Sequence, residues 1–380
     1  MTVLIVDGFE SYGDDTSAGA DIEALILATN RIDYQYVTGG GHTGGVVELV
    51  DDFETLGYAL QGPLMSAARG EYVLYEWPDG TGRFPDYRVS TNGSSPDFAA
   101  GFRFLNAEIS PSSTITTTIF NGMNSASGTA FSLQIMPNGV DLRLVDNDAI
   151  TYDAVGVLTQ GTWHYIEVEW KQTTIGNGPY CKVYVDGNLV IDETNIDLAG
   201  FTFFNTWGFR VGWGCSGGNQ IDNGNFFSFD DVYGMVLDGV DHTAPLGACR
   251  VYAMRPASDE SVTFSPSVGG DNYALIDETD QDQTDYVESG VGGDIDKYGL
   301  TPLDNVSAVH GVRVDVSCIA IGSATTLAIG LDDGTLDEQS MGSIGTGSVV
   351  NTQQVFEEDP SNAAWTEASV EAVQATQKEV

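Results

Sequence analysis

Apolar and polar residues alternate one by one along much of this chain, and few segments carry a helical period. Alternation of this kind places every second side chain on the same face of a strand. It is clearest in residues 98–108 (FAAGFRFLNAE) and 162–172 (TWHYIEVEWKQ). The pattern predicts an all-β protein. In the second run it assigns these residues to two faces: Trp163, Tyr165, Glu167 and Glu169 to one, and His164, Ile166, Val168 and Trp170 to the other.

Two short turns within this pattern predict β-hairpins. Asn138-Gly139 separates FSLQIM from VDLRLV, and Asp186-Gly187 lies at the centre of residues 181–193 (CKVYVDGNLVIDE). Both dipeptides accept the positive φ angles of a tight two-residue turn. Because strands recur at short intervals around such turns, we expect an antiparallel sandwich rather than β-α-β units.

The length of 380 residues favours two domains, and the composition changes in one place. Around residues 238–249 polar residues, one proline and two glycines separate two apolar regions, as in a linker. We therefore predict a first domain over residues 1–240 and a second, also β-rich, over 248–380. Near the end, the segment DPSNAAWTEASVEAVQ has an Asx-type start and small apolar residues at helical spacing, which predicts one short helix.

Three motifs in a fixed order resemble the laminin-G/concanavalin-A-like lectin and glucanase jelly roll. They are WHYIEVEW at 163–170, VYVDG at 183–187 and FDDVY at 229–233. The segment LIVDGFESY at 4–12 is similar to the start of jelly-roll proteins in tailed-bacteriophage virions, and so is the pattern from VYAMRP (251–256) to the DP and WT pairs near 359–366. The resemblance implies a concanavalin-A-like jelly-roll sandwich followed by a second, smaller β-sandwich with one short helix, in a virion structural protein of the capsid or the tail.

The charge is strongly unbalanced, with 55 acidic residues against 14 Lys and Arg and a formal net charge of −41. Such a field repels phosphate backbones and anionic lipid surfaces, so we expect no binding to nucleic acid and no membrane insertion. The chain has no apolar run of 18 or more residues, and its first residues lack the basic region of a signal peptide. We expect assembly in a host cytoplasm. The four cysteines and four histidines are scattered without metal-ligand spacing, which favours buried thiols over a zinc site or disulfides.

The nearest match to a catalytic pattern is the pair Glu167 and Glu169. Concanavalin-A-like glycosidases, which the motifs resemble, carry two or three alternating carboxylates on one strand, where they can flank a glycosidic bond. Here the intervening Asp and the third acid are missing. We expect a solvated strand face rather than an acid pair, and no enzyme activity.

Sugar binding in jelly rolls uses aromatic rings that stack on the sugar, with neighbouring polar groups on its hydroxyls. Trp77 in YEWPDG, Tyr87 in FPDYR and Trp213 beside the loop 214–225 are the candidate aromatic residues. Each has the alternative of being an ordinary core residue, as most aromatic side chains in sandwiches are.

Two adjacent acids, Asp230 and Asp231, interrupt the aromatic stretch FFSFDDVYG at 226–234. On a regular strand they face opposite ways, so without a bulge they cannot share one ion. The resemblance implies calcium held by Asp7, Glu10 and one of these two acids, where the first and last strands meet. The alternative is that Asp231 binds a nearby turn and Asp230 is solvated. The acidic loop 277–285 lacks the glycine and final glutamate of an EF-hand, so we expect a solvated loop there.

These observations together indicate a virion surface protein, of the capsid decoration, head fibre or tail fibre type, that makes contacts rather than performs chemistry. Its expected partners are other virion proteins, further copies of itself in a homotrimer, and host-surface glycans for adhesion. Two alternatives stay open: a polysaccharide-degrading glycoside hydrolase with Glu167 and Glu169 as its acids, and a capsid cement protein without a ligand.

Overall fold

The computed structural model describes fifteen stretches of the chain, and for strands β1–β5 and β14 it describes the backbone. The described residues are 3–7, 34–37, 48–52, 57–63, 71–76, 97–106, 116–123, 129–171, 178–196, 206–211, 226–237, 242–277, 284–303, 306–347 and 350–380. No helix within these residues is long and apolar enough to cross a membrane.

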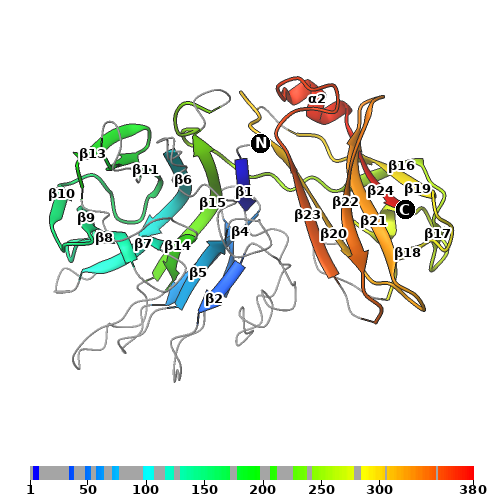
Figure 1. The fold of residues 1–380 in the computed structure, drawn as a ribbon, viewed down its shortest axis with the longest axis horizontal. Coiled ribbons are helices and arrows are strands. Elements are labelled where there is room, and N and C mark those ends of the chain that lie inside the picture. The colour runs from blue at the N-terminus through cyan, green and yellow to red at the C-terminus, as the bar shows by residue number, and fades with distance from the viewer. Residues whose placement is uncertain are drawn as a thin grey trace.

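The strands up to β15 form two antiparallel sheets, as the alternation predicts (Figure 1). The first has the order β13-β12-β11-β6-β15-β4-β3, with β1 also paired to β15. Its strands are β1 (Val3–Asp7), β3 (Glu48–Asp52), β4 (Gly57–Pro63), β6 (Asp97–Asn106), β11 (Trp163–Lys171), β12 (Tyr180–Val185), β13 (Asn188–Thr194) and β15 (Phe226–Leu237). The second has the order β10-β9-β8-β7-β14-β5-β2. Its strands are β2 (Tyr34–Val37), β5 (Glu71–Glu76), β7 (Thr117–Met123), β8 (Thr129–Ile135), β9 (Leu142–Asp146), β10 (Thr151–Ala154) and β14 (Thr206–Val211).

The two sheets enclose one aromatic and aliphatic core. Phe102 on β6 stacks on Phe120 of β7, with ring centroids 5.7 Å apart, and Trp170 on β11 packs against Phe131 of β8 at 5.6 Å. Ile166, Val168 and Trp170 are fully buried there, which confirms the predicted inner face of residues 163–170. The first sheet therefore has an inner face on this core and an outer face, and the outer face carries the candidate site.

Both predicted hairpins are present. β8 pairs with β9 around Gly139, and β12 pairs with β13 around Asp186 and Gly187, whose φ angles are 49° and 76°. Asp186 also binds back to β11: Nδ1 of His164 lies 2.6 Å from its Oδ2, and the Tyr165 amide donates to its Oδ1. The Thr159 amide donates to Nε2 of His164, so Nε2 is the acceptor and Nδ1 carries the proton. Hydrogen bonds to Asp186 thus join the start of the WHYIEVEW motif to the turn of the VYVDG motif.

The strands from β16 onward form three further sheets (Figure 1). A five-stranded sheet has the order β16-β19-β24-β21-β22, and two-stranded sheets pair β17 with β18 and β20 with β23. The elements are β16 (Pro256–Ser261), β17 (Ser265–Pro266), the 3₁₀ helix η2 (Tyr273–Leu275), β18 (Val287–Glu288), β19 (Ile295–Leu300), β20 (Val312–Cys318), β21 (Thr325–Asp332), β22 (Leu336–Ile344), β23 (Val350–Phe356), α2 (Glu367–Ala372) and β24 (Gln374–Glu379). Leu327 and Ile329 of β21 pack against Val314 and Val316 of β20, so these sheets make a second sandwich core.

The predicted short helix is present, but its start differs from the prediction. Helix α2 begins after Thr366, whose hydroxyl accepts from the Ser369 amide while the Ser369 hydroxyl accepts from the Thr366 amide. This reciprocal capping leaves Asp359 outside the helix. Its carboxylate instead closes a separate turn by accepting from the amides of Ser361 and Ala363. The sequence contains two local start signals seven residues apart, and the second one begins the helix.

Candidate functional site

The two acids of FFSFDDVYG lie on the same face of the sheet. The register of β15 against β6 shifts between Asp230 and Tyr233, and Asp231 has a φ of 51°. One extra residue in the bulge turns Asp231 outward beside Asp230, while Phe229 and Val232 stay in the core. The expectation that these neighbours face opposite sides is therefore wrong. Asp230 is 1% exposed and Asp231 3%, so the expectation of a solvated Asp230 is wrong as well.

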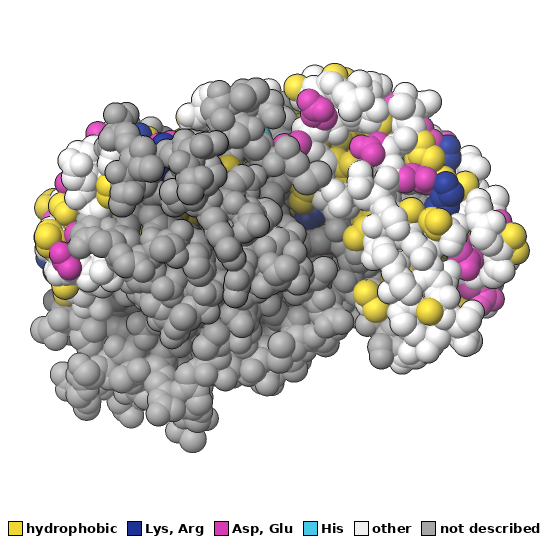
Figure 2. Space-filling model, viewed as in Figure 1, with side chains coloured by type: hydrophobic (Ala, Val, Ile, Leu, Met, Phe, Trp, Pro, Cys, Tyr) yellow, Lys and Arg dark blue, Asp and Glu magenta, His cyan; other side chains and the backbone are white. Residues whose placement is uncertain are grey.

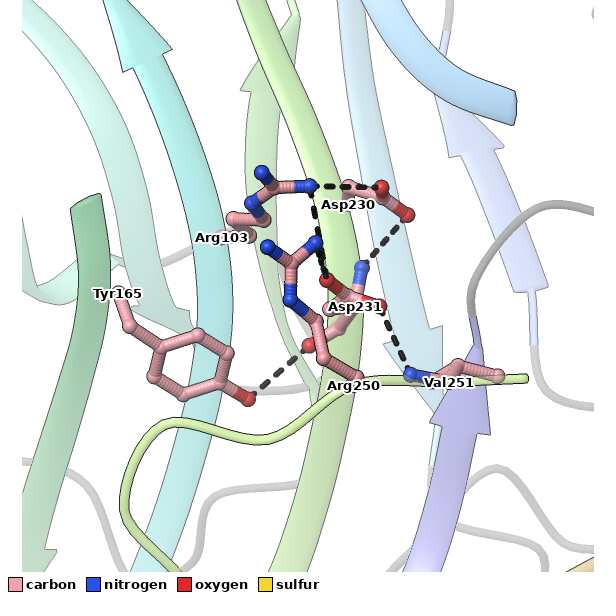
Figure 3. A network of polar contacts seen from close by, with 6 residues as sticks. All are labelled: Arg103, Tyr165, Asp230, Asp231, Arg250 and Val251. Carbon is pink, nitrogen blue, oxygen red and sulfur yellow. Dashed lines mark hydrogen bonds and ion pairs between the residues drawn. The ribbon is translucent and has the colours of Figure 1, made fainter. Parts of the chain in front are cut away.

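Both acids face the guanidinium of Arg103, which points outward from β6 (Figure 3). Its Nη1 lies 3.8 Å from Oδ2 of Asp230 and 4.0 Å from Oδ2 of Asp231. Arg103 is itself 3% exposed and stacks over the Trp163 ring at 4.3 Å. Buried charges of this kind are stable only when they are paired, so Arg103 compensates the two acids within the sheet.

Asp231 also binds the segment that leaves the first sandwich, residues 242–251, which we call the connector. Its carboxylate accepts from the Val251 amide at 2.8 Å and from Nη1 of Arg250 at 3.1 Å (Figure 3). Its carbonyl accepts from the hydroxyl of Tyr165 on β11 at 3.0 Å. The bulge thus turns an ordinary strand residue into an anchor for the chain that follows.

A second contact row crosses the outer face beside the bulge. Gly101 of β6 pairs with Glu167 on one side and with Tyr233 on the other. A Cβ on Gly101 would lie 2.2 Å from the Tyr233 ring, so the ring crosses this strand only because residue 101 has no side chain. The Tyr233 hydroxyl then donates to Oε1 of Glu167 at 2.5 Å, and the Gly247 amide of the connector donates to the same oxygen at 2.8 Å.

The connector covers this outer face and keeps water from it. Leu246 and Cys249 pack on a cluster of Ala99, Tyr165, Tyr233, Met235 and Leu237, together with Val355 of β23. Glu167 is 3% exposed beneath them, so the expectation of a solvated strand face is wrong at this position. Burial raises the pKa of Glu167 above its ordinary value, although the bonds from Tyr233 and Gly247 oppose the rise. Burial likewise raises the pKa of the Cys249 thiol to about 12.

Glu169 is held by a separate set of partners on the neighbouring strand β12. Tyr180 donates to its Oε1 at 2.7 Å, Tyr184 to its Oε2 at 2.9 Å, and Nζ of Lys182 lies 3.1 Å from Oε1. The Tyr180 hydroxyl is also 2.8 Å from Oδ2 of Asp97. Burial, with these two acids beside it, raises the pKa of Tyr180. Glu167 and Glu169 do alternate on one face, as predicted, but each carboxylate is engaged by its own donors.

The proposed sugar and calcium residues are mostly beyond this description. Trp77, Tyr87, Trp213 and Glu10 lie outside the described residues, and Asp7 is described by its backbone, which pairs with Val232. Within the described stretches, no three His, Cys, Asp or Glu residues are grouped as a metal site requires. The Asp231 carboxylate accepts from the Val251 amide and is paired with the guanidinium groups of Arg250 and Arg103. The sugar site and the calcium site both stay predictions.

Several residues of this outer face were not singled out from the sequence. Tyr180, Lys182 and Tyr184 alternate on β12, and pairing of the predicted hairpin with β11 would have placed them beside Glu169. Gly101 and Arg103 lie at alternate positions of β6 and alternate with the buried residues Phe102 and Phe104. The bulge that brings Asp231 to this face has no comparable sequence signal.

No family model matches this chain, and no curated protein matches it. Solved structures to which this chain has some similarity include the endo-β-1,4-glucuronan lyase of the fungus Trichoderma reesei, at 16% identity and a TM-score of 0.36, covering 53% of this chain and 95% of the lyase. Domain 4 of AbnA, an extracellular arabinanase of Geobacillus stearothermophilus, has 16% identity and a TM-score of 0.35, and the match covers 62% of this chain and 92% of that domain. The receptor binding domain of botulinum neurotoxin D has 14% identity and a TM-score of 0.35, and the match covers 83% of this chain and 76% of that domain. At these values none of the three assigns a ligand or an activity to this chain.

Proposed function

We propose that this chain is a non-catalytic structural and adhesive protein of a tailed-bacteriophage particle, with a lectin-like first sandwich. One observation carries the non-catalytic part. The nearest match to a catalytic acid pair in the sequence, Glu167 and Glu169, is engaged in internal hydrogen bonds, and the connector covers Glu167. A glycosidase needs such carboxylates open to a sugar ring on their strand face.

The virion part of the proposal is supported by the sequence resemblance of residues 4–12 and of the pattern within 251–366. A particle surface also suits a net charge of −41, because mutual repulsion keeps such proteins soluble at high density. The proposed partners are neighbouring virion proteins and further copies in a homotrimer. The proposed ligand is a host-surface glycan stacked on Trp77, Tyr87 or Trp213.

Two experiments test these parts separately. Cryo-electron microscopy of purified virions, with an antibody against the chain, should place it on the capsid or tail surface; its absence from virions contradicts the particle role. A glycan array with the purified chain should show binding that weakens in Trp77→Ala, Tyr87→Ala or Trp213→Ala. Binding to no glycan, with a place on the capsid lattice, would instead support the ligand-free cement protein.

A further inference from the structure

The end of the second sandwich that holds β17 and β18 exposes apolar side chains. Four of the large hydrophobic residues that are exposed in the described chain lie within residues 262–291: Val262 (40% exposed), Val268 (47%), Tyr286 (41%) and Val291 (62%). We call them the tip residues. Figure 2 shows hydrophobic and acidic side chains at the end of the molecule where Figure 1 labels β17 and β18, with Lys and Arg side chains beside them. Apolar groups gathered on a surface indicate a contact with another molecule.

The backbone of two tip residues, Tyr286 and Val291, is held by hydrogen bonds of both its amide and its carbonyl. Tyr286 donates from its amide to the Ser267 hydroxyl, and its carbonyl accepts from the Ser267 amide, both at 2.8 Å. The Val291 amide donates to the Ser289 hydroxyl, and its carbonyl accepts from the Asp294 amide. These side chains are therefore presented on a fixed frame, which lowers the entropy cost of binding.

A fully buried acid fixes the neighbouring turn. Asp296 is 0% exposed, and its Oδ1 accepts from the amides of Thr263 and Phe264 at 2.6 and 2.8 Å. Its Oδ2 accepts from Nδ2 of Asn272 and from the Tyr298 hydroxyl. The turn that follows Val262 is thus tied to the sheet beneath it. The tip residues therefore lie on an ordered part of the surface and are not part of the buried core.

The stretch of sequence that carries the tip residues has charge of one sign. Residues 256–296 contain eleven Asp and Glu and no Lys, Arg or His. The basic residues directly before and after this range are engaged: Arg255 donates to the Asp277 carbonyl, and Lys297 is paired with Asp332. A second copy of this chain would bring the same acidic stretch against itself, and phosphate-rich surfaces are repelled in the same way. The surface that complements the tip is apolar and basic.

We propose that the β17–β18 end is a docking surface for a protein partner that presents Arg or Lys around apolar side chains. The tip residues supply the apolar contact, and the surrounding acids attract the basic rim of the partner. This inference goes beyond the proposed function and does not depend on it, since it concerns other residues than the sugar and acid residues discussed above.

The test uses the full chain and a fluorescent peptide in which Arg and Leu alternate, with polarisation as the readout. Control peptides carry Glu at every Arg position, or Ser at every Leu position. The double variant Tyr286→Ser/Val291→Ser should bind the Arg-Leu peptide about tenfold more weakly or worse. The matched double variant Ile150→Ser/Val155→Ser, at 52% and 79% exposed positions of the first sandwich, should bind as the wild type does.

Melting temperatures close to that of the wild type confirm that both double variants are folded. Equal affinity of the two double variants, or equal affinity for the Arg-Leu and Arg-Ser peptides, overturns the proposal. Sedimentation velocity of the wild type and of the Tyr286→Ser/Val291→Ser variant measures whether the chain associates with itself. Self-association that the Tyr286→Ser/Val291→Ser variant loses would identify a second copy as the occupant and would also overturn it.

Discussion

The hydroxyl of Tyr233 on β15 reaches Glu167 on β11 across the intervening strand β6, and the two oxygens are 2.5 Å apart. The reach depends on Gly101, which pairs with both residues and leaves room for the tyrosine ring. The Gly247 amide of the connector donates to the same oxygen of Glu167. Three strands and the following segment of chain are therefore joined at one buried carboxylate.

Replacing Gly101 with alanine should disrupt this row. The new Cβ would lie 2.2 Å from Cε1 of Tyr233, and the ring and its bond to Glu167 must shift. We expect a loss of about 1–3 kcal/mol in the free energy of unfolding, as for other overpacked sites. Urea denaturation measures it. Gly290→Ala is the matched control, because an added Cβ there meets nothing within 4 Å; equal stability of the two variants would contradict this account.

The stability contributed by Glu167 should depend on pH. Burial raises its pKa in the folded state above the ordinary value of 4.5, so the folded protein holds this proton more tightly than the unfolded chain. The stability of the wild type relative to Glu167→Gln should therefore be highest below pH 4.5 and fall as the pH rises through the raised pKa. Glutamine keeps an oxygen for Tyr233 and Gly247. Denaturation curves across this range test the prediction, and a difference that stays constant or increases with pH argues against it.

Removing the charge of Asp231 should cost more than removing its exposed partner. Asp231 is 3% exposed beside Arg103, whereas the Arg250 side chain is 33% exposed. We expect Asp231→Asn to lower the stability by about 3–5 kcal/mol, because Arg103 loses part of its compensation. Asparagine tolerates the left-handed backbone at this position, so the substitution isolates the charge. Arg250→Ala should cost about 0–1 kcal/mol. The reverse order in chemical denaturation would show that the pairing with Arg103 is unimportant.

The turn of the β12–β13 hairpin should depend on the side chain of Asp186. Asp186→Ala removes the acceptor for His164 and for the Tyr165 amide, and we expect a loss of about 1–3 kcal/mol. Asp186→Asn keeps an acceptor oxygen and the positive φ, so its loss should be smaller. Thermal unfolding of both variants, with exposed Asp192→Ala as the control, measures the difference. Equal losses in Asn and Ala would mean that only the negative charge matters.

The fold class, the hairpins and the inner face of β11 followed from the sequence because each depends on local alternation or on a single turn. Ile166, Val168 and Trp170 alternate with polar residues, and only one arrangement buries all three. Asp186-Gly187 requires a tight turn, whatever lies around it.

The outer face could not be derived in the same way, because its character is set by contacts between distant segments. Alternation shows that Glu167 leaves the core, but not that the connector, 80 residues later, covers it. The bulge at Asp231 is equally non-local, since the register against β6 and the anchoring of Val251 both depend on it. For this reason the strand face at Glu167 was predicted to be solvated but is buried. Asp230 and Asp231 were predicted to point to opposite faces but lie on the same one.

The central claim is that Glu167 and Glu169 stabilise the sandwich and do not cleave a glycan. The most direct measurement is a glycan-release assay on host-surface polysaccharide with the wild type, Glu167→Gln and Glu169→Gln, alongside their unfolding curves. We expect no release by any of the three proteins, and altered stability in the variants. Release by the wild type that both folded variants lose would contradict the account and make the pair catalytic.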